Sequence, residues 1–120
     1  MPILFLLNES TDPDIPGDMT IFRDQEHLIL QVEAIDVRNN EYFAFTSDGR
    51  KLSLYAESDY APVQAEIEAD PVHAKEVMLL LKRYLMFCAE DGRFNVDREA
   101  VESARDLSQL TVLIPEVLIT

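Results

Sequence analysis

The stretch EYFAFTSDGRKLSLYA, residues 41–56, decides the fold because it predicts a β-hairpin. Residues 41–46 alternate in character and are rich in aromatic side chains, as is typical of a strand. Residues 47–50, Ser-Asp-Gly-Arg, predict a tight turn in which Gly49 is free to adopt a positive φ. Residues 51–56 alternate again, so the two runs are expected to pair as antiparallel strands.

Three further strands are predicted around the hairpin. Residues 63–68 alternate apolar and polar side chains, which extends the hairpin into a three-stranded meander. Residues 1–7 predict a buried strand and not a signal peptide, because the apolar run has no basic flank and acidic residues follow it at once. Residues 8–18 contain proline and glycine and predict a loop, and residues 19–22 predict a second short strand.

A helix that Asp24 caps is predicted to run through Ala34, although the same residues also fit a strand. Three apolar residues have the i, i+4, i+7 spacing of an amphipathic helix, namely Leu28, Val32 and Ile35. Leu28, Leu30 and Val32 also alternate as in a strand. We favour the helix, because Asp24 is a good cap and the acidic Glu26 suits the first turn.

A long helix is predicted to begin at the cap residue Asp70, with Pro71 in its first position, and to run to about Glu90. Gly92 then suits the C-terminal cap. The wide apolar face of this helix is typical of packing across a sheet.

The C-terminal region is predicted to contain one more helix and an edge strand. Asn95 is expected to cap a helix to about Leu107, and the apolar residues 110–119, which Pro115 interrupts, suit an edge strand. The whole pattern predicts a single α+β domain over residues 1–120, in which two or three helices pack on one face of a small antiparallel β-sheet.

Negative charge dominates the composition. The 120 residues include 23 acidic and 10 basic ones, for a net charge of −13. Nucleic acid and membrane surfaces are therefore not expected as partners. Residues 1–70 contain 15 acidic and four basic residues, a net charge of −11, whereas residues 71–120 contain eight and six, a net charge of −2. This concentration favours rapid capture of a basic partner, and an ordinary acidic surface is the alternative.

Catalytic, metal and cofactor sites are not predicted, so we do not expect an enzyme. Three acidic residues in the first loop lack the glycine and the final glutamate of a calcium loop: Asp12, Asp14 and Asp18. His73 and Glu76 lie one helical turn apart, but a polar pair is favoured over a metal site because further ligands are few. Cys88 is expected to be buried, and a single cysteine is typical of a reducing cytoplasm.

Three segments within residues 19–85 are recognisable: Val-Glu-Ala-Ile-Asp-Val at residues 32–37, Glu41-Tyr42, and the turn at residues 47–50. On these segments the chain resembles a group of small acidic bacterial proteins that includes immunity proteins of polymorphic and contact-dependent toxin systems. The resemblance implies a cytoplasmic inhibitor that binds a cognate toxin domain, often a basic nuclease, and blocks its active site or substrate groove. Its negative charge would then imitate nucleic acid.

Six acidic or tyrosine residues near strand ends and loops are the candidate partner-binding residues: Asp36, Glu41, Tyr42, Glu57, Asp59 and Tyr60. Tyrosine beside carboxylates suits an interface, because it buries a large area at low entropic cost while the acids meet Lys or Arg. Packing on the sheet is the alternative for Tyr42 and Tyr55. A second function also stays open, a non-enzymatic interaction or regulatory module that forms a homodimer through residues 110–119.

Overall fold

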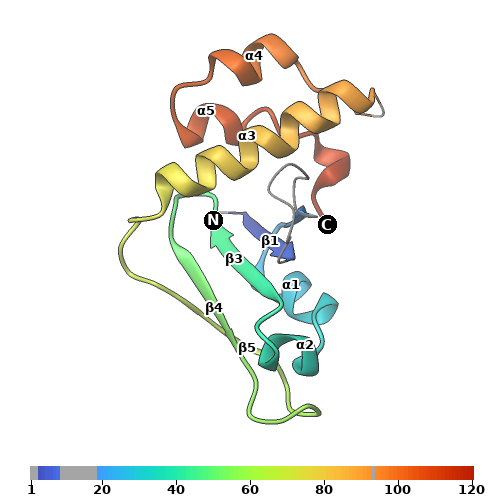
Figure 1. The fold of residues 1–120 in the computed structure, drawn as a ribbon, viewed down its shortest axis with the longest axis vertical. Coiled ribbons are helices and arrows are strands. Elements are labelled where there is room, and N and C mark those ends of the chain that lie inside the picture. Colours follow the sequence, from blue (N-terminus) through green and yellow to red (C-terminus); the bar gives the residue numbers. More distant parts are fainter. Residues whose placement is uncertain (1–2, 9–18, 93) are drawn as a thin grey trace.

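The computed structural model describes residues 3–8, 19–92 and 94–120, and it confirms the α+β fold class (Figure 1). The strands are β1 (Leu4–Asn8), β2 (Met19–Phe22), β3 (Tyr42–Thr46), β4 (Lys51–Tyr55) and β5 (Gln64–Ile67). They form one antiparallel sheet in the order β2-β1-β3-β4-β5. The helices are α1 (Gln25–Gln31), α2 (Ala34–Arg38), α3 (Ala74–Asp91), α4 (Arg98–Ser103), α5 (Leu107–Thr111) and the 3₁₀ helix η1 (Glu116–Leu118). The described residues thus hold more helices than the two or three that the sequence predicts.

The predicted hairpin and meander are confirmed. Ala44 lies opposite Leu52 and Phe45 lies opposite Lys51, and β5 pairs with the other edge of β4. The N-terminal strand is also confirmed, because β1 is buried between β2 and β3. The sheet therefore has an N-terminal strand beside a hairpin that forms more than thirty residues later in the chain.

Helices cover both faces of the sheet, whereas the sequence predicted one covered face. One face of the sheet packs against α3, α4 and α5 through Phe5, Leu7, Ile21 and Phe45. The opposite face packs against α1 and α2 through Leu4, Leu6, Ala44 and Leu52. The reason lies in β1: four consecutive residues of that strand, 4–7, are apolar and buried, and successive side chains of a strand point to opposite faces.

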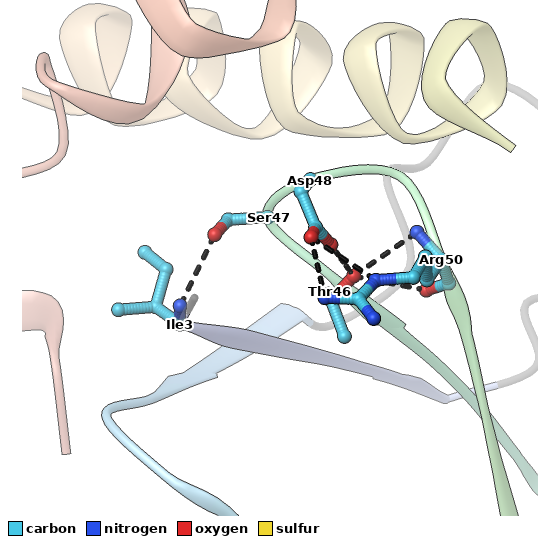
Figure 2. A network of polar contacts seen from close by, with 5 residues as sticks. All are labelled: Ile3, Thr46, Ser47, Asp48 and Arg50. Atoms are coloured by element: carbon cyan, nitrogen blue, oxygen red, sulfur yellow. Dashed lines mark hydrogen bonds and ion pairs between the residues drawn. The ribbon is translucent and has the colours of Figure 1, made fainter. Parts of the chain in front are cut away.

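The turn between β3 and β4 is held by polar contacts and lies under α3 (Figure 2). The buried Thr46 Oγ1 donates to Asp48 and accepts from the backbone N–H of Arg50 at 3.0 Å. Hydrogen bonds from the Arg50 guanidinium lower the pKa of Asp48 below its usual range. The backbone N–H of His73 donates to the Gly49 carbonyl at 3.0 Å, which fixes the hairpin tip to the residue before α3.

The region after β2 is helical, as favoured, but the predicted helix through Ala34 is wrong in its length. The Asp24 carboxylate caps α1 by accepting from the backbone N–H of His27 at 2.9 Å. The helix ends at Gln31, and Val32 adopts an extended conformation with φ −101° and ψ 143° before α2 begins. The break buries Val32 and leaves Ile35 partly exposed, so Ile35 does not join the core as its spacing predicted.

The predicted N-terminal cap of the long helix is also wrong, whereas its C-terminal cap is confirmed. The helix begins at Ala74 and not after Asp70, and no side chain caps it. The tertiary hydrogen bond from His73 to the hairpin tip overrides the local preference of Asp70 and Pro71. At the other end Gly92 is left-handed, with φ 72°, as expected of a C-terminal cap.

The C-terminal region differs most from the prediction. In place of one helix capped by Asn95, the Asp97 and Asp106 carboxylates cap α4 and α5 separately. The predicted edge strand at residues 110–119 is wrong, because α5 and η1 occupy half of it and only Ile119 forms a bridge, parallel to Ile21. Val112 and Val117 of this tail are exposed, and a homodimer through the tail stays a prediction.

Two remaining predictions concern the loop and the membrane. The predicted loop and the acidic residues Asp12, Asp14 and Asp18 lie outside the described residues. In the part of the chain that the structure describes, every helix is too short or too polar to cross a bilayer.

Candidate functional site

The candidate residues gather at one end of the molecule, around α2 and the connection between β4 and β5. The molecule measures 45 × 28 × 26 Å, and these segments form its lower tip in Figure 1. Arg38 of α2 ties the connection in place, because its Nη1 lies 2.7 Å from the Asp59 Oδ1. We call this end, with Glu33, Asp36, Glu41, Glu57 and Asp59, the acidic end.

Asp36, Glu41 and Tyr42 form a contiguous cluster at the turn from α2 into β3. The Tyr42 hydroxyl donates to Asp36 Oδ2 at 3.3 Å, and the backbone N–H of Glu41 donates to the Asp36 carbonyl at 3.2 Å. A carboxyl–carboxyl hydrogen bond with Asp36, together with its negative charge, raises the pKa of Glu41. Burial, followed by the charge of Asp36, raises the pKa of the Tyr42 hydroxyl. The turn therefore concentrates negative charge, and Tyr42 lines it as a half-buried side chain.

The other three candidates lie on the connection between β4 and β5. Glu57 accepts a hydrogen bond from the Tyr55 hydroxyl at 3.3 Å, and Asp59 pairs with Arg38. Tyr60 is 99% exposed, the most open of the large apolar side chains described. Tyr55 is half exposed, so neither of these two tyrosine side chains is buried in the core.

Most carboxylates of the acidic end lack a cationic neighbour. Among the residues that the structure describes, no Lys or Arg side chain lies at ion-pair distance from Glu33, Asp36, Glu41 or Glu57. By contrast, Asp48 at the opposite end of the hairpin is paired with Arg50 and has a structural role. The negative charge of these four carboxylates is therefore uncompensated by Lys or Arg among the described residues.

An open apolar groove of about 550 Å³ lies next to α2, and sequence reasoning missed it. Its walls are the α1–α2 junction and residues 59–63, and Glu33 and Asp59 stand at its polar margin. Leu30, Ile35 and Tyr60 line the groove and are 82%, 44% and 99% exposed. One signal was present in the sequence: residues two apart on a helix lie on roughly opposite sides, so a buried Leu28 places Leu30 on the surface.

His73, Glu76 and Cys88, which the sequence also singled out, lie outside the acidic end. His73 Nδ1 lies 3.2 Å from Glu76 Oε2, which confirms the predicted polar pair at the helix end. Cys88 is buried, as expected, and burial raises the pKa of its thiol. Within the described ranges, no three His, Cys, Asp or Glu side chains are grouped so that they would hold a metal ion.

The Asp36–Glu41 pair gives a direct prediction for titration. We expect the Glu41 carboxyl to titrate above its usual range in NMR, and Asp36→Asn to return its pKa towards that range. Because the pKa of Glu41 is raised in the folded state, its protonated form stabilises the fold at low pH. This contribution to the free energy of unfolding is lost as the pH rises through the raised pKa. Glu57→Gln is the control and should leave the Glu41 titration unchanged. An unshifted Glu41 in the wild-type protein would contradict the pairing.

A scan against protein-family models and searches of curated proteins and of solved structures found no match to this chain. The comparisons therefore add no support to the resemblance noted in the sequence, which stays a prediction.

Proposed function

We propose that the chain is an immunity-type protein that binds and neutralises a cognate bacterial toxin domain, one with a basic, nuclease-like surface. The observation that carries this proposal is the gathering at one end of the molecule of Glu33, Asp36, Glu41 and Glu57, which have no cationic partner among the residues that the structure describes. A surface of one sign attracts a partner of the opposite sign and raises the rate of association. The resemblance in sequence to small acidic immunity proteins points in the same direction.

The position of the acidic end supports inhibition by occlusion. The segments that carry these carboxylates, α2 and the connection between β4 and β5, lie at the tip of the long axis (Figure 1), where a protein presents its narrowest profile to a concave partner. A nuclease holds its substrate with basic residues that bind phosphates. Carboxylates that enter the substrate groove of a nuclease would pair with the same cationic side chains and so exclude the nucleic acid. The cytoplasm, where such a toxin acts, is the proposed location.

The test is neutralisation of three of these carboxylates at once. Under this proposal, a neighbouring gene is expected to encode the cognate toxin domain. We expect Asp36→Asn/Glu41→Gln/Glu57→Gln to lower the rate constant for association with this domain by about tenfold or more at low salt. The salt dependence should also become shallower, because fewer charges remain to be screened. Stopped-flow fluorescence measures the rate, and growth of cells that co-express the toxin measures protection.

The matched control removes the same charge from the opposite end of the molecule. Glu90→Gln/Glu99→Gln/Glu102→Gln alters exposed residues of α3 and α4 and gives the same net charge. This variant should keep most of the association rate and the protection. Equal losses in both triple variants would mean that only net charge matters, and unchanged toxicity with wild-type protein would refute the proposed function.

A further inference from the structure

We propose that the groove beside α2 is the anchor point of the interface, and that it takes an apolar side chain flanked by Arg or Lys on a surface helix or loop of the partner. This inference rests on the proposed function and names the chemistry of the partner segment. The acidic end attracts such a segment, and the groove holds it.

The walls of the groove are fixed before a partner arrives. Val32 and Val63 are buried beneath it, Leu30 lies on the exposed side of α1, and the break between α1 and α2 leaves Ile35 facing outward. The ion pair between Arg38 and Asp59 holds the opposite wall against α2. A preformed site avoids the entropic cost of ordering its own walls when it binds.

The groove brings three exposed apolar side chains together on the surface. Leu30 and Tyr60 are almost fully exposed and Ile35 is nearly half exposed, and all three face the same groove. Clusters of exposed apolar side chains with a polar margin mark interaction sites in soluble proteins. Tyrosine is also enriched among the residues that dominate binding energy, because it buries a large area with few rotatable bonds.

Charge at the margin selects the occupant. A second copy of this chain would bring Glu33 and Asp59 against the same two residues, because a two-fold interface uses one surface on both subunits. Nucleic acid is repelled by the same carboxylates. A segment with an apolar tip and flanking cations fits both the groove and its margin, and its Lys or Arg would pair with Glu33, which has no cationic partner among the described residues.

The test uses two synthetic helix-forming peptides. The first carries a central leucine with arginines one helical turn to either side, and the second replaces this leucine with alanine and keeps every arginine. We expect the leucine peptide to bind about tenfold more tightly by isothermal titration calorimetry, with NMR shifts at Leu30, Ile35 and Tyr60. Equal affinity of the two peptides would overturn the inference, as would concentration-dependent shifts at the groove in the protein alone, which would indicate a second copy.

Leu30→Gln and Tyr60→Ser change exposed side chains, so both variants should keep the fold. Each should remove most of the preference for the leucine peptide. The matched control is Leu79→Gln, the same replacement at a 65% exposed residue of α3, and it should leave the preference intact. Loss of preference in all three variants, or in none of them, would refute the groove as the anchor.

Kinetics with the toxin domain separate this inference from the proposed function. The groove variants should raise the dissociation rate constant and leave association nearly unchanged, whereas the carboxylate variants should lower association. Unchanged dissociation in Leu30→Gln with a lost association rate in the carboxylate variant would overturn the groove and keep the proposed function. A toxin domain that the wild-type protein never binds would refute the proposed function, and the peptide experiment would still decide the chemistry of the groove.

Discussion

Replacing Phe5 with alanine is expected to lower the free energy of unfolding by about 3–5 kcal/mol, which is the usual cost of truncating a buried phenylalanine. Phe5 is 0% exposed on the inner strand β1 and lies between Ile21 of β2 and Phe45 of β3. It packs in the same core cluster as the buried face of α3, so the cavity would lie between sheet and helix. Unfolding in urea, followed by circular dichroism, measures the loss.

Phe43→Ala is the matched control, because it makes the same change on the same face of the sheet. Phe43 lies opposite Leu7 in β1, two residues from Phe45, but it is 45% exposed because the helices of that face do not bury it. Its loss should be about 1 kcal/mol or less. A typical domain has only about 5–15 kcal/mol of stability, so Phe5→Leu, which keeps most of the apolar volume, provides a milder second variant. Equal losses for Phe5 and Phe43 would contradict the burial of Phe5 beneath the helices of this face.

The strands could be predicted from the sequence because their signals are local. The alternation in residues 41–56 and the glycine at position 49 specify the hairpin without any help from the rest of the chain. The four apolar residues of β1 also contained the information that both faces of the sheet are covered. Four buried apolar residues in a row require cover on each face, and helices α1 and α2 cover the second face.

The helix boundaries could not be predicted because tertiary contacts decide them. The spacing of Leu28, Val32 and Ile35 fits one continuous helix, yet the chain breaks so that Val32 joins the cluster that contains Val63 and Leu52. Asp70 and Pro71 form a good local start signal, but the contact between His73 and Gly49 moves the start to Ala74. Neither contact can be inferred from the residues next to the helix boundary.

The candidate site was predictable in its charge and not in its shape. The excess of acidic residues in the first 70 positions follows from counting, and the turn at Asn39-Asn40 places Asp36 near Glu41. The groove requires the break between α1 and α2 and the ion pair from Arg38 to Asp59, which lie 21 residues apart in the chain. Composition therefore indicates the charge of the proposed partner, and only the fold indicates where its proposed apolar side chain would bind.

Replacing Gly49 with alanine is expected to cost about 2–5 kcal/mol of folding free energy from two separate effects. Gly49 has φ 90°, where a residue with a Cβ is strained by about 1–2 kcal/mol. A Cβ at this position would also lie 2.7 Å from the Ala74 Cα and 2.8 Å from the Ala74 Cβ, at the first residue of α3. Neither atom belongs to a flexible side chain, so hairpin tip and helix must separate, at a cost of about 1–3 kcal/mol.

Gly92→Ala measures the first effect alone, because Gly92 has a similar positive φ of 72° but nothing within 4 Å of the position that its Cβ would occupy. Its cost should be the conformational strain alone, about 1–2 kcal/mol. The difference between the two variants in urea unfolding then measures the close approach between the hairpin tip and α3. In Gly49→Ala, hydrogen exchange should also accelerate at the His73 amide, which donates to the Gly49 carbonyl. Equal unfolding free energies for the two variants would show that the tip does not press on the helix, and the long helix would then need another reason to begin at Ala74 rather than beside Asp70.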